Sequence, residues 1–125
     1  MVAASRCRAA GWRVAVVDNF PFGGTCALRG CDPKKVLVGA AEAVHRARQL
    51  YGKGIAGDTS IAWRELMSFK RMFTDAVPAM KEHSCPSKGI DPYHGLARFV
   101  NSNTVMVSGK ELEGRYILLA VGALP

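Results

Sequence analysis

The chain has 125 residues, enough for one small domain with a modest core but not for several folded units. Its hydrophobic content of 49% and charged content of 22% are ordinary for a globular protein. The net charge of +7 comes from basic residues spread along the chain, without the clustering and interleaved aromatic residues that nucleic-acid binding needs. We therefore expect no nucleic-acid partner, and a phosphate-bearing cofactor or plain solvation explains the excess charge equally well.

The sequence shows no segment typical of a membrane or exported protein. No apolar run approaches the length that spans a bilayer, and residues 1–10 lack the continuous apolar stretch of a secretory signal. We therefore expect a cytoplasmic protein with no membrane partner. Structural disulfides are uncommon in that compartment, so Cys7 and Cys85 are predicted to be small packed side chains.

The N-terminal part predicts one helix and one strand. Residues 2–10 are rich in alanine and suit a helix, which Gly11 ends. The β-branched run at residues 13–17 is typical of a buried parallel strand, and Asp18 stands where that strand ends. Residues 19–24 contain a proline and two glycines and predict a loop.

Two helices are predicted in the middle of the chain. Asp32 is a good N-cap, and Pro33 suits the first helical position. Apolar residues then recur at a helical spacing: Val36, Leu37, Ala40, Val44, Ala47 and Leu50. A second helix is predicted from about residue 61 to 81, with Pro78 bending or shortening it.

The C-terminal third changes to the pattern of short strands. Residues 95–100 and 104–107 are candidates, and residues 115–121 predict a third, largely buried strand. The order of the elements favours an α/β domain with a small antiparallel β-meander appended to it.

Cys26 and Cys31 form the most informative pair. If Cys31 lies at a helix N-terminus, an irregular turn can bring the two sulfurs within disulfide range. The helix dipole, Lys34 and Lys35 would lower the thiol pKa values and favour the thiolate, whereas the charge of Asp32 would oppose this. The sequence leaves the balance of these effects open.

Spacing alone leaves other interpretations of the pair open. Cys26 and Cys31 could be half of a zinc site completed by His83 and Cys85, although the second pair is poorly spaced for that role. They could also form a structural disulfide, which the expected compartment argues against, or be two packed thiols.

The whole string from Gly23 to Lys35 is more specific than the spacing. It reads Gly-Gly-Thr-Cys, three further residues, Gly-Cys, one residue, Pro-Lys-Lys. It closely resembles the active-site signature of the pyridine nucleotide–disulfide oxidoreductases, a family that includes glutathione reductase, trypanothione reductase, dihydrolipoamide dehydrogenase and mercuric reductase. Every fixed position of that signature is filled, and Lys34–Lys35 is most similar to the glutathione and trypanothione reductase branch.

The resemblance extends beyond this motif. Residues 2–17 look like the first helix and second strand of the family's FAD domain, and Asp18 falls where an acidic residue binds the adenosine ribose. Residues 93–105 and 117–125 resemble later parts of that domain, although Val121 replaces a threonine of the family segment. Asp32 likewise replaces an apolar residue of the family motif.

The resemblance implies a role for each site residue. Electrons would pass from NADPH or NADH to FAD and then to the Cys26–Cys31 disulfide. Cys31 would be the flavin-proximal thiol, Cys26 the thiol that attacks a disulfide-containing or related small substrate, and Lys34 would lie near the reactive edge of the flavin. No metal is expected. The implied cofactor-binding residues are Asp18, Gly23, Gly24, Thr25, Lys34, Lys35, Ala120 and Gly122.

The sequence also predicts a partial domain. The chain begins after the place where a Gly-x-Gly-x-x-Gly turn should cradle the FAD pyrophosphate, and the strand before that turn is not found either. We therefore expect residues 1–125 to be a single partial FAD-binding, Rossmann-like domain, a fragment of a homodimeric parent without its nicotinamide-binding and dimerisation domains. Such a fragment is expected to bind FAD weakly or not at all and to show no turnover. A non-catalytic remnant or interaction module is the alternative.

Overall fold

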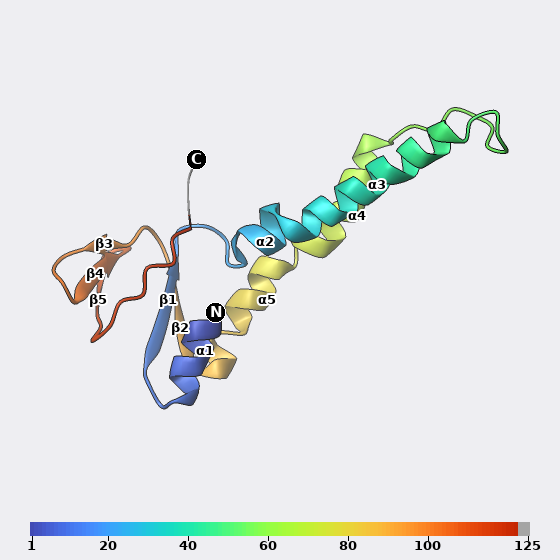
Figure 1. Cartoon of the computed structure of the whole chain (residues 1–125). Coiled ribbons are helices and arrows are strands. Elements are labelled where there is room, and N and C mark those ends of the chain that lie inside the picture. The colour runs from blue at the N-terminus through green and yellow to red at the C-terminus, as the bar shows by residue number, and fades with distance from the viewer. Residues whose placement is uncertain (123–125) are drawn as a thin grey trace. The chain divides into compact units, whose positions relative to one another are not determined.

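The computed structural model describes residues 1–122, in which helices are combined with two small β-sheets (Figure 1). The helices are α1 (Val2–Ala9), α2 (Gly24–Arg29), α3 (Cys31–Gln49), α4 (Trp63–Thr74) and α5 (Val77–His83). The strands are β1 (Val14–Asp18), β2 (Ile90–His94), β3 (Arg98–Phe99), β4 (Thr104–Val107) and β5 (Lys110–Glu113). A 3-10 helix, Pro86–Lys88, precedes β2. The predicted mixture of helices and strands is confirmed, whereas its Rossmann-like arrangement stays a prediction.

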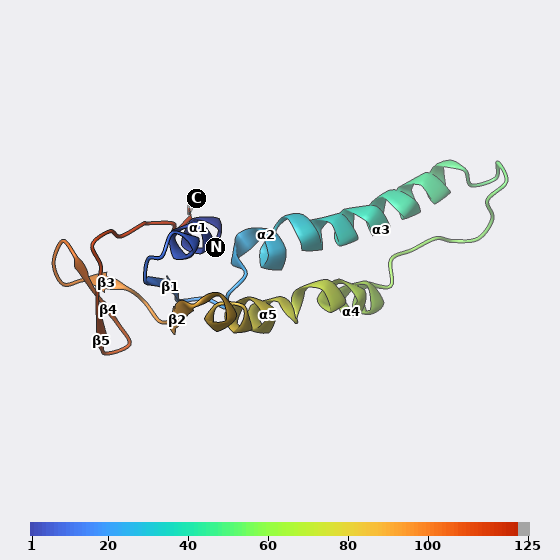
Figure 2. The ribbon, with the colours of Figure 1, turned by 90° about the horizontal axis from the view of Figure 1, so that it is seen from below.

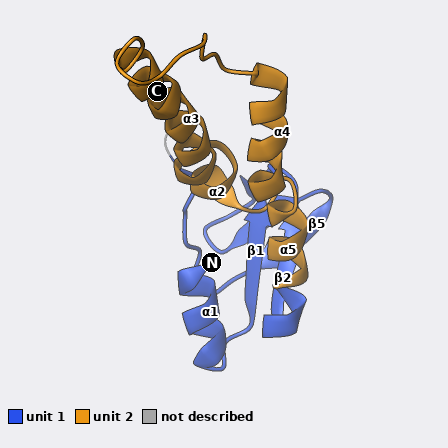
Figure 3. Cartoon of the chain, turned by 90° about the vertical axis from the view of Figure 1, so that its right-hand side faces the viewer, with its two compact units in different colours: residues 1–20, 85–125 blue, residues 21–84 orange. Residues whose placement is uncertain are grey.

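The chain divides into two compact units, which Figure 3 colours separately. The first unit comprises residues 1–20 and the described residues from 85 onward, and it contains both sheets. The second unit comprises residues 21–84 and contains helices α2 to α5. The sequence predicts that residues 1–125 form one domain, which would include both of these units. That single domain stays a prediction.

A pair of parallel strands forms the centre of the first unit. β1 pairs with β2 so that Val14 lies opposite Ile90 and Asp18 lies opposite His94. The Ile90 side chain is fully buried. The parallel strand predicted at residues 13–17 is therefore confirmed, but its partner β2 was not predicted. The reason is Pro92, because a proline cannot donate to a strand ladder and argues against a strand.

The second sheet is the predicted antiparallel meander with a different last strand. It has the order β3-β4-β5, and β4 matches the predicted bounds 104–107. After β4 the chain reverses at once, because Ser108 and Gly109 adopt positive φ values of 47° and 79°. Two such residues are typical of a tight hairpin turn, which pairs residues 110–113 with β4.

The strand predicted at residues 115–121 is wrong. Its described residues form neither helix nor strand, and Leu118, Leu119 and Val121 are 75%, 67% and 91% exposed. An apolar run becomes a buried strand only where another strand pairs with it, and neither sheet in the described part of the chain includes these residues. Residues 123–125, the end of the segment 117–125 that resembles the family, lie outside the described residues.

In the second unit, α4 lies alongside α3 (Figure 2). The stripe predicted on α3 is half-buried from Val36 to Ala47, and only its last member, Leu50, is exposed. The helix begins at Cys31 with Gly30 as its N-cap, so the prediction of Asp32 as the N-cap is wrong. Asp32 lies instead in the first turn of the helix, and Pro33 is buried.

The second predicted helix is divided in two. α4 ends at Thr74 and α5 begins at Val77, with Pro78 in the first turn of α5. Proline is tolerated in a first turn, where its missing N–H would be unpaired in any case. The shortening predicted at Pro78 is therefore confirmed. The short helix α2 was not predicted, because it begins at Gly24, which the sequence assigns to the preceding loop.

No helix among residues 1–122 combines the length and the apolar character needed to cross a bilayer.

Shortening Ile90 tests whether the parallel pair is the core of the first unit. Ile90→Ala should lower the free energy of unfolding by about 2–5 kcal/mol, since it removes buried methyl groups and leaves a cavity. The measurement is urea unfolding followed by Trp12 fluorescence in a Trp63→Phe background, because Trp12 lies in the first unit and Trp63 in the second.

Leu96→Ala is the matched control, because Leu96 belongs to the same unit and is 59% exposed. It should change the free energy of unfolding by less than about 0.5 kcal/mol. Equal losses in the two variants would contradict this description of the core.

Candidate functional site

The two predicted redox cysteines meet at the turn between α2 and α3. Cys26 belongs to α2, and Cys31 is the first residue of α3. Both side chains are exposed, and Cys31 is the group that most affects the pKa of Cys26. None of the four cysteines is in a disulfide in this structure. The structure therefore brings together the pair that the sequence singled out.

Gly30 makes this close approach possible. A Cβ atom at residue 30 would lie 3.0 Å from the carbonyl oxygen of Thr25 and 3.2 Å from the Cα of Cys26. Both are backbone atoms, which cannot swing aside as the end of a flexible side chain can. Glycine lacks the Cβ, so the chain can turn from α2 into α3 at this single residue.

The two glycines that open the motif have different roles. Gly23 has a φ of 144°, and a Cβ there would lie 3.0 Å from Leu28 Cδ1 and 3.1 Å from Val77 Cγ1. Gly24 has a φ of 71° with open space where its Cβ would be. Gly23 therefore permits close packing, whereas Gly24 leaves its backbone accessible from solvent, next to the exposed Thr25.

The thiol contact dominates the electrostatics of the pair. The pKa of Cys26 is raised above 9.0, chiefly because its side chain hydrogen-bonds the Cys31 thiol. The backbone N–H of Cys31, donating to the Cys26 sulfur, acts in the opposite direction. Partial desolvation and the charges of Cys31 and Asp32 raise the pKa further. For Cys26 the balance that the sequence left open therefore favours the protonated thiol.

Lys34 and Lys35 follow the thiols along α3. The backbone N–H of Lys34 donates to the Gly30 carbonyl oxygen at 3.0 Å and so begins the helical hydrogen bonding. Both lysine side chains are exposed. The second unit thus holds the predicted residues from Gly23 to Lys35 on one short stretch of chain.

The remaining predicted cofactor residues lie in the first unit. Asp18 is the last residue of β1 and is half-buried. Its Oδ1 accepts a hydrogen bond from the backbone N–H of Phe20 at 2.9 Å, which leaves Oδ2 to accept others. Ala120 and Gly122 are exposed, and Gly122 has a positive φ of 78°.

The described residues do not support a zinc site made of Cys26, Cys31, His83 and Cys85. Within residues 1–122 no three side chains of His, Cys, Asp or Glu lie together so that they could hold a metal ion. Cys85 is fully buried in the first unit, which confirms that it is a packed side chain, and His83 is exposed in the second.

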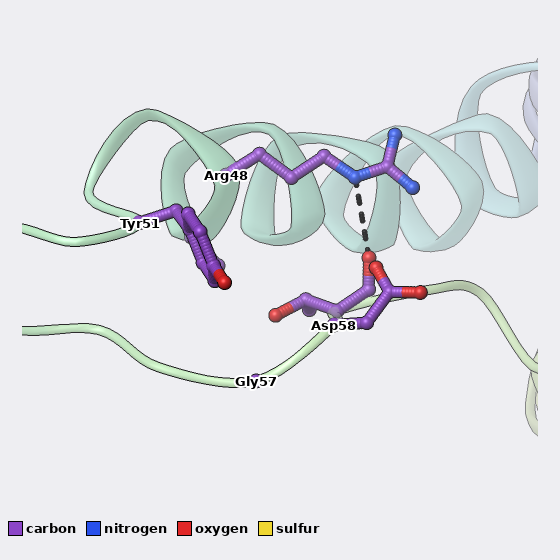
Figure 4. Close-up of a pocket in the computed structure, with 6 residues that line it drawn as sticks. Arg48, Tyr51, Gly57 and Asp58 are labelled. Carbon is purple, nitrogen blue, oxygen red and sulfur yellow. Dashed lines mark hydrogen bonds between the residues drawn. The ribbon is translucent and has the colours of Figure 1, made fainter.

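A hollow of about 450 Å³ lies near the other end of α3 (Figure 4). Arg48 borders it, and its Nε donates to the carbonyl oxygen of Thr59 at 3.2 Å. At 1.5 Å per residue, Arg48 is about 25 Å along the helix from Cys31. The predicted site residues therefore do not line this hollow.

A Gly-x-Gly-x-x-Gly string that was not predicted occurs beside the hollow at Gly52, Gly54 and Gly57. All three glycines have positive φ values. The string follows helix α3, whereas the dinucleotide-binding turn follows a strand. The spacing alone therefore does not make this loop a pyrophosphate site.

Sequence comparison finds clear relatives, although no model of a known protein family matches the chain. Glutathione reductase of Burkholderia cepacia is 32% identical over 116 residues, which are 92% of this chain and 26% of that protein. Dihydrolipoyl dehydrogenase 2 of Haloarcula marismortui is 30% identical over 99% of this chain and 28% of its own length. Mercuric reductase of Bacillus cereus is 31% identical over 89% of this chain and 18% of its own length.

Structural comparison agrees with the sequence. The HOCl-induced flavoprotein disulfide reductase RclA from Escherichia coli matches with a TM-score of 0.65 and 28% identity, over 90% of this chain and 23% of that one. The chain thus spans about a quarter of the length of the relatives it matches. Its homologues are oxidoreductases, and the chain corresponds to one part of the flavoprotein disulfide reductases of the pyridine nucleotide–disulfide oxidoreductase family.

Proposed function

We propose that this chain supplies the redox-active dithiol of an FAD-dependent disulfide oxidoreductase. In this proposal the Cys26–Cys31 pair carries two electrons from a flavin to a disulfide or a related small substrate. The close approach of the backbone at Gly30 to Thr25 and Cys26, which sets Cys31 at the start of α3 beside α2, is the observation that carries the proposal, since a disulfide forms readily only where two cysteines are held close together.

Each of the two units has residues that suit one part of FAD. In the first unit, Asp18 stands at the carboxyl end of a parallel strand with Oδ2 available to ribose hydroxyl groups. In the second unit, the open space over Gly24 and the exposed Thr25 suit the approach of a flat ring. Lys34 and Lys35 add positive charge on the same stretch of chain. We propose that residues 1–125 together form part of an FAD-binding domain.

The thiols perform the exchange with substrate. When bound, FAD supplies two electrons, which it receives as a hydride from NADPH or NADH. In the reduced pair, the Cys26 thiolate attacks one sulfur of the substrate disulfide, and the other sulfur leaves as a thiolate. The Cys31 thiolate then attacks the Cys26 sulfur and expels the second product. The substrate gains two electrons and two protons, and the Cys26–Cys31 disulfide forms.

Oxidation of the chain should produce one specific disulfide. We expect mild oxidation to link Cys26 to Cys31, and reduced glutathione to reverse the link while glutathione disulfide forms. Trypsin cleaves after Arg29, so mass spectrometry of the digest will find a peptide containing Cys26 joined to one containing Cys31.

Cys26→Ser and Cys31→Ser should each abolish that linked peptide, whereas Cys7→Ser should leave it unchanged. Separate glutathione adducts on the two cysteines, without the linked peptide, would argue against the proposal.

The Gly30 turn provides a second test. Gly30→Ala places a Cβ against two backbone atoms at 3.0 and 3.2 Å, so the turn must open and the sulfurs must separate. Overpacking of this kind costs about 1–3 kcal/mol, and we expect the equilibrium constant for disulfide formation to fall about tenfold. Redox titration against glutathione measures it.

Gly39→Ala is the control, because it lies in the same helix with no atom within 4 Å of its Cβ position. It should leave the disulfide equilibrium unchanged. If the two alanine variants behave alike, Gly30 does not determine the contact between the thiols.

The role of Asp18 is measurable by nuclear magnetic resonance. The Phe20 amide donates to Asp18 Oδ1, so its signal should move when millimolar FAD is added to the full chain. Asp18→Asn retains an oxygen for Phe20 but loses the charge, and FAD affinity should fall on the order of tenfold.

Asp91→Asn is the matched control, because Asp91 is an exposed carboxylate on the neighbouring strand β2. It should bind FAD as the unaltered chain does. If the Phe20 amide signal does not move, or if the Asp18→Asn variant binds FAD as tightly as the unaltered chain, Asp18 does not bind the cofactor.

A further inference from the structure

We propose that Val77 of α5 is a positioning residue for the dithiol. It packs with Leu28 of α2 in the space that Gly23 leaves open, and this packing holds α2 so that the Cys26–Cys31 disulfide forms more readily. The inference rests on the proposed dithiol function and adds to it a residue outside the motif. Val77 acts through α2 and touches neither substrate nor cofactor in this proposal.

The short helix α2 needs support from its surroundings. It has 6 residues, fewer than the roughly 12–15 that an isolated helix needs in water, and no side chain caps its first turn. Its first three residues, Gly24, Thr25 and Cys26, are exposed, whereas Ala27 and Leu28 are half-buried. The position of Cys26 therefore depends on what the half-buried part of α2 packs against.

Leu28 and Val77 approach the Gly23 backbone together. The point where a Cβ of residue 23 would stand is 3.0 Å from Leu28 Cδ1 and 3.1 Å from Val77 Cγ1. Two side chains from different helices thus share the space that a side chain at residue 23 would need. Val77 is half-buried and is the first residue of α5, so a helix outside the motif contributes to this packing.

The chain is anchored on both sides of this packing. Phe22, which precedes Gly23, is 4% exposed, and Thr74, which ends α4 shortly before Val77, is equally buried. The backbone under Leu28 and the start of α5 are therefore both held in place. Leu28 lies between them, and the loss of the Val77 side chain would leave it room to move.

The connection to the sulfurs runs along α2. Leu28 lies between Cys26 and Gly30, the residue at which the chain turns into α3 and Cys31. A disulfide tolerates only a narrow range of Cα–Cα separations, so a loosened α2 spends less time in the geometry that the bond requires. Loss of the Val77 contact should therefore disfavour the oxidised pair more than the reduced pair, in which no bond fixes the separation of the sulfurs.

The test is redox titration of the full chain against glutathione, with the linked tryptic peptide as the measure of oxidation. Val77→Ala removes both γ carbons, and the equilibrium constant for Cys26–Cys31 disulfide formation should fall about threefold. The titration compares the oxidised and reduced forms of one variant, so a loss of stability common to both forms leaves this constant unchanged. A purely structural role for Val77 therefore would not move it.

Met80→Ala is the matched control, because it shortens a side chain of the same helix that is 66% exposed. It should leave the disulfide equilibrium unchanged. Leu28→Ala tests the same contact from α2 and should also lower the equilibrium constant. Because Leu28 and Val77 act through one contact, the loss in the double variant should be smaller than the product of the two single losses. Circular dichroism verifies that each variant is folded.

Equal equilibrium constants in Val77→Ala and Met80→Ala, or single losses that simply multiply in the double variant, would overturn the inference. If the unaltered chain forms no linked Cys26–Cys31 peptide, the proposed function fails instead. The two failures are therefore distinguishable.

Discussion

The close contact between the backbones of Gly30 and Cys26 is the constraint on which the reactive part of this chain depends. Because Gly30 has no Cβ, α2 can end at Arg29 and α3 can begin at Cys31 with this one residue between them. Cys31 therefore becomes the first residue of α3, where its N–H has no partner within the helix. Through this N–H, Cys31 also lowers the pKa of Cys26, although the net shift is upward. One missing side chain thus determines where the two cysteines lie relative to each other.

Opposing effects act on the Cys26 thiol at this turn. A helix N-terminus and two lysines favour a thiolate in general, and the bond from the Cys31 N–H follows that expectation. The neighbouring Cys31 thiol raises the pKa of Cys26, and the charge of Asp32 acts in the same direction. For Cys26 the net result is a raised pKa, which favours the protonated thiol.

Local patterns predicted the elements whose structure depends on nearby residues, such as α1, α3 and β4. These patterns failed where the pairing of distant segments determines whether a strand forms. β2 forms despite Pro92 because β1 lies beside it. Residues 115–121 are apolar, but they pair with neither sheet. In the site, the thiol pair could be predicted because its spacing is local. The function of Gly30 and the position of Asp32 inside the helix depend on ångström-scale contacts that a sequence pattern does not contain.

The four cysteines show how far this context decides chemistry. Cys85 is fully buried among the few apolar residues that form the core and behaves there as a small hydrophobic side chain. Cys26 and Cys31 are exposed on either side of the Gly30 turn. A buried thiol is shielded from disulfides and electrophiles, whereas an exposed pair can exchange one bond between its own sulfurs for a bond to a substrate. Redox chemistry is therefore a property of the α2–α3 turn, which supplies both exposure and contact, rather than of the cysteine content of the chain.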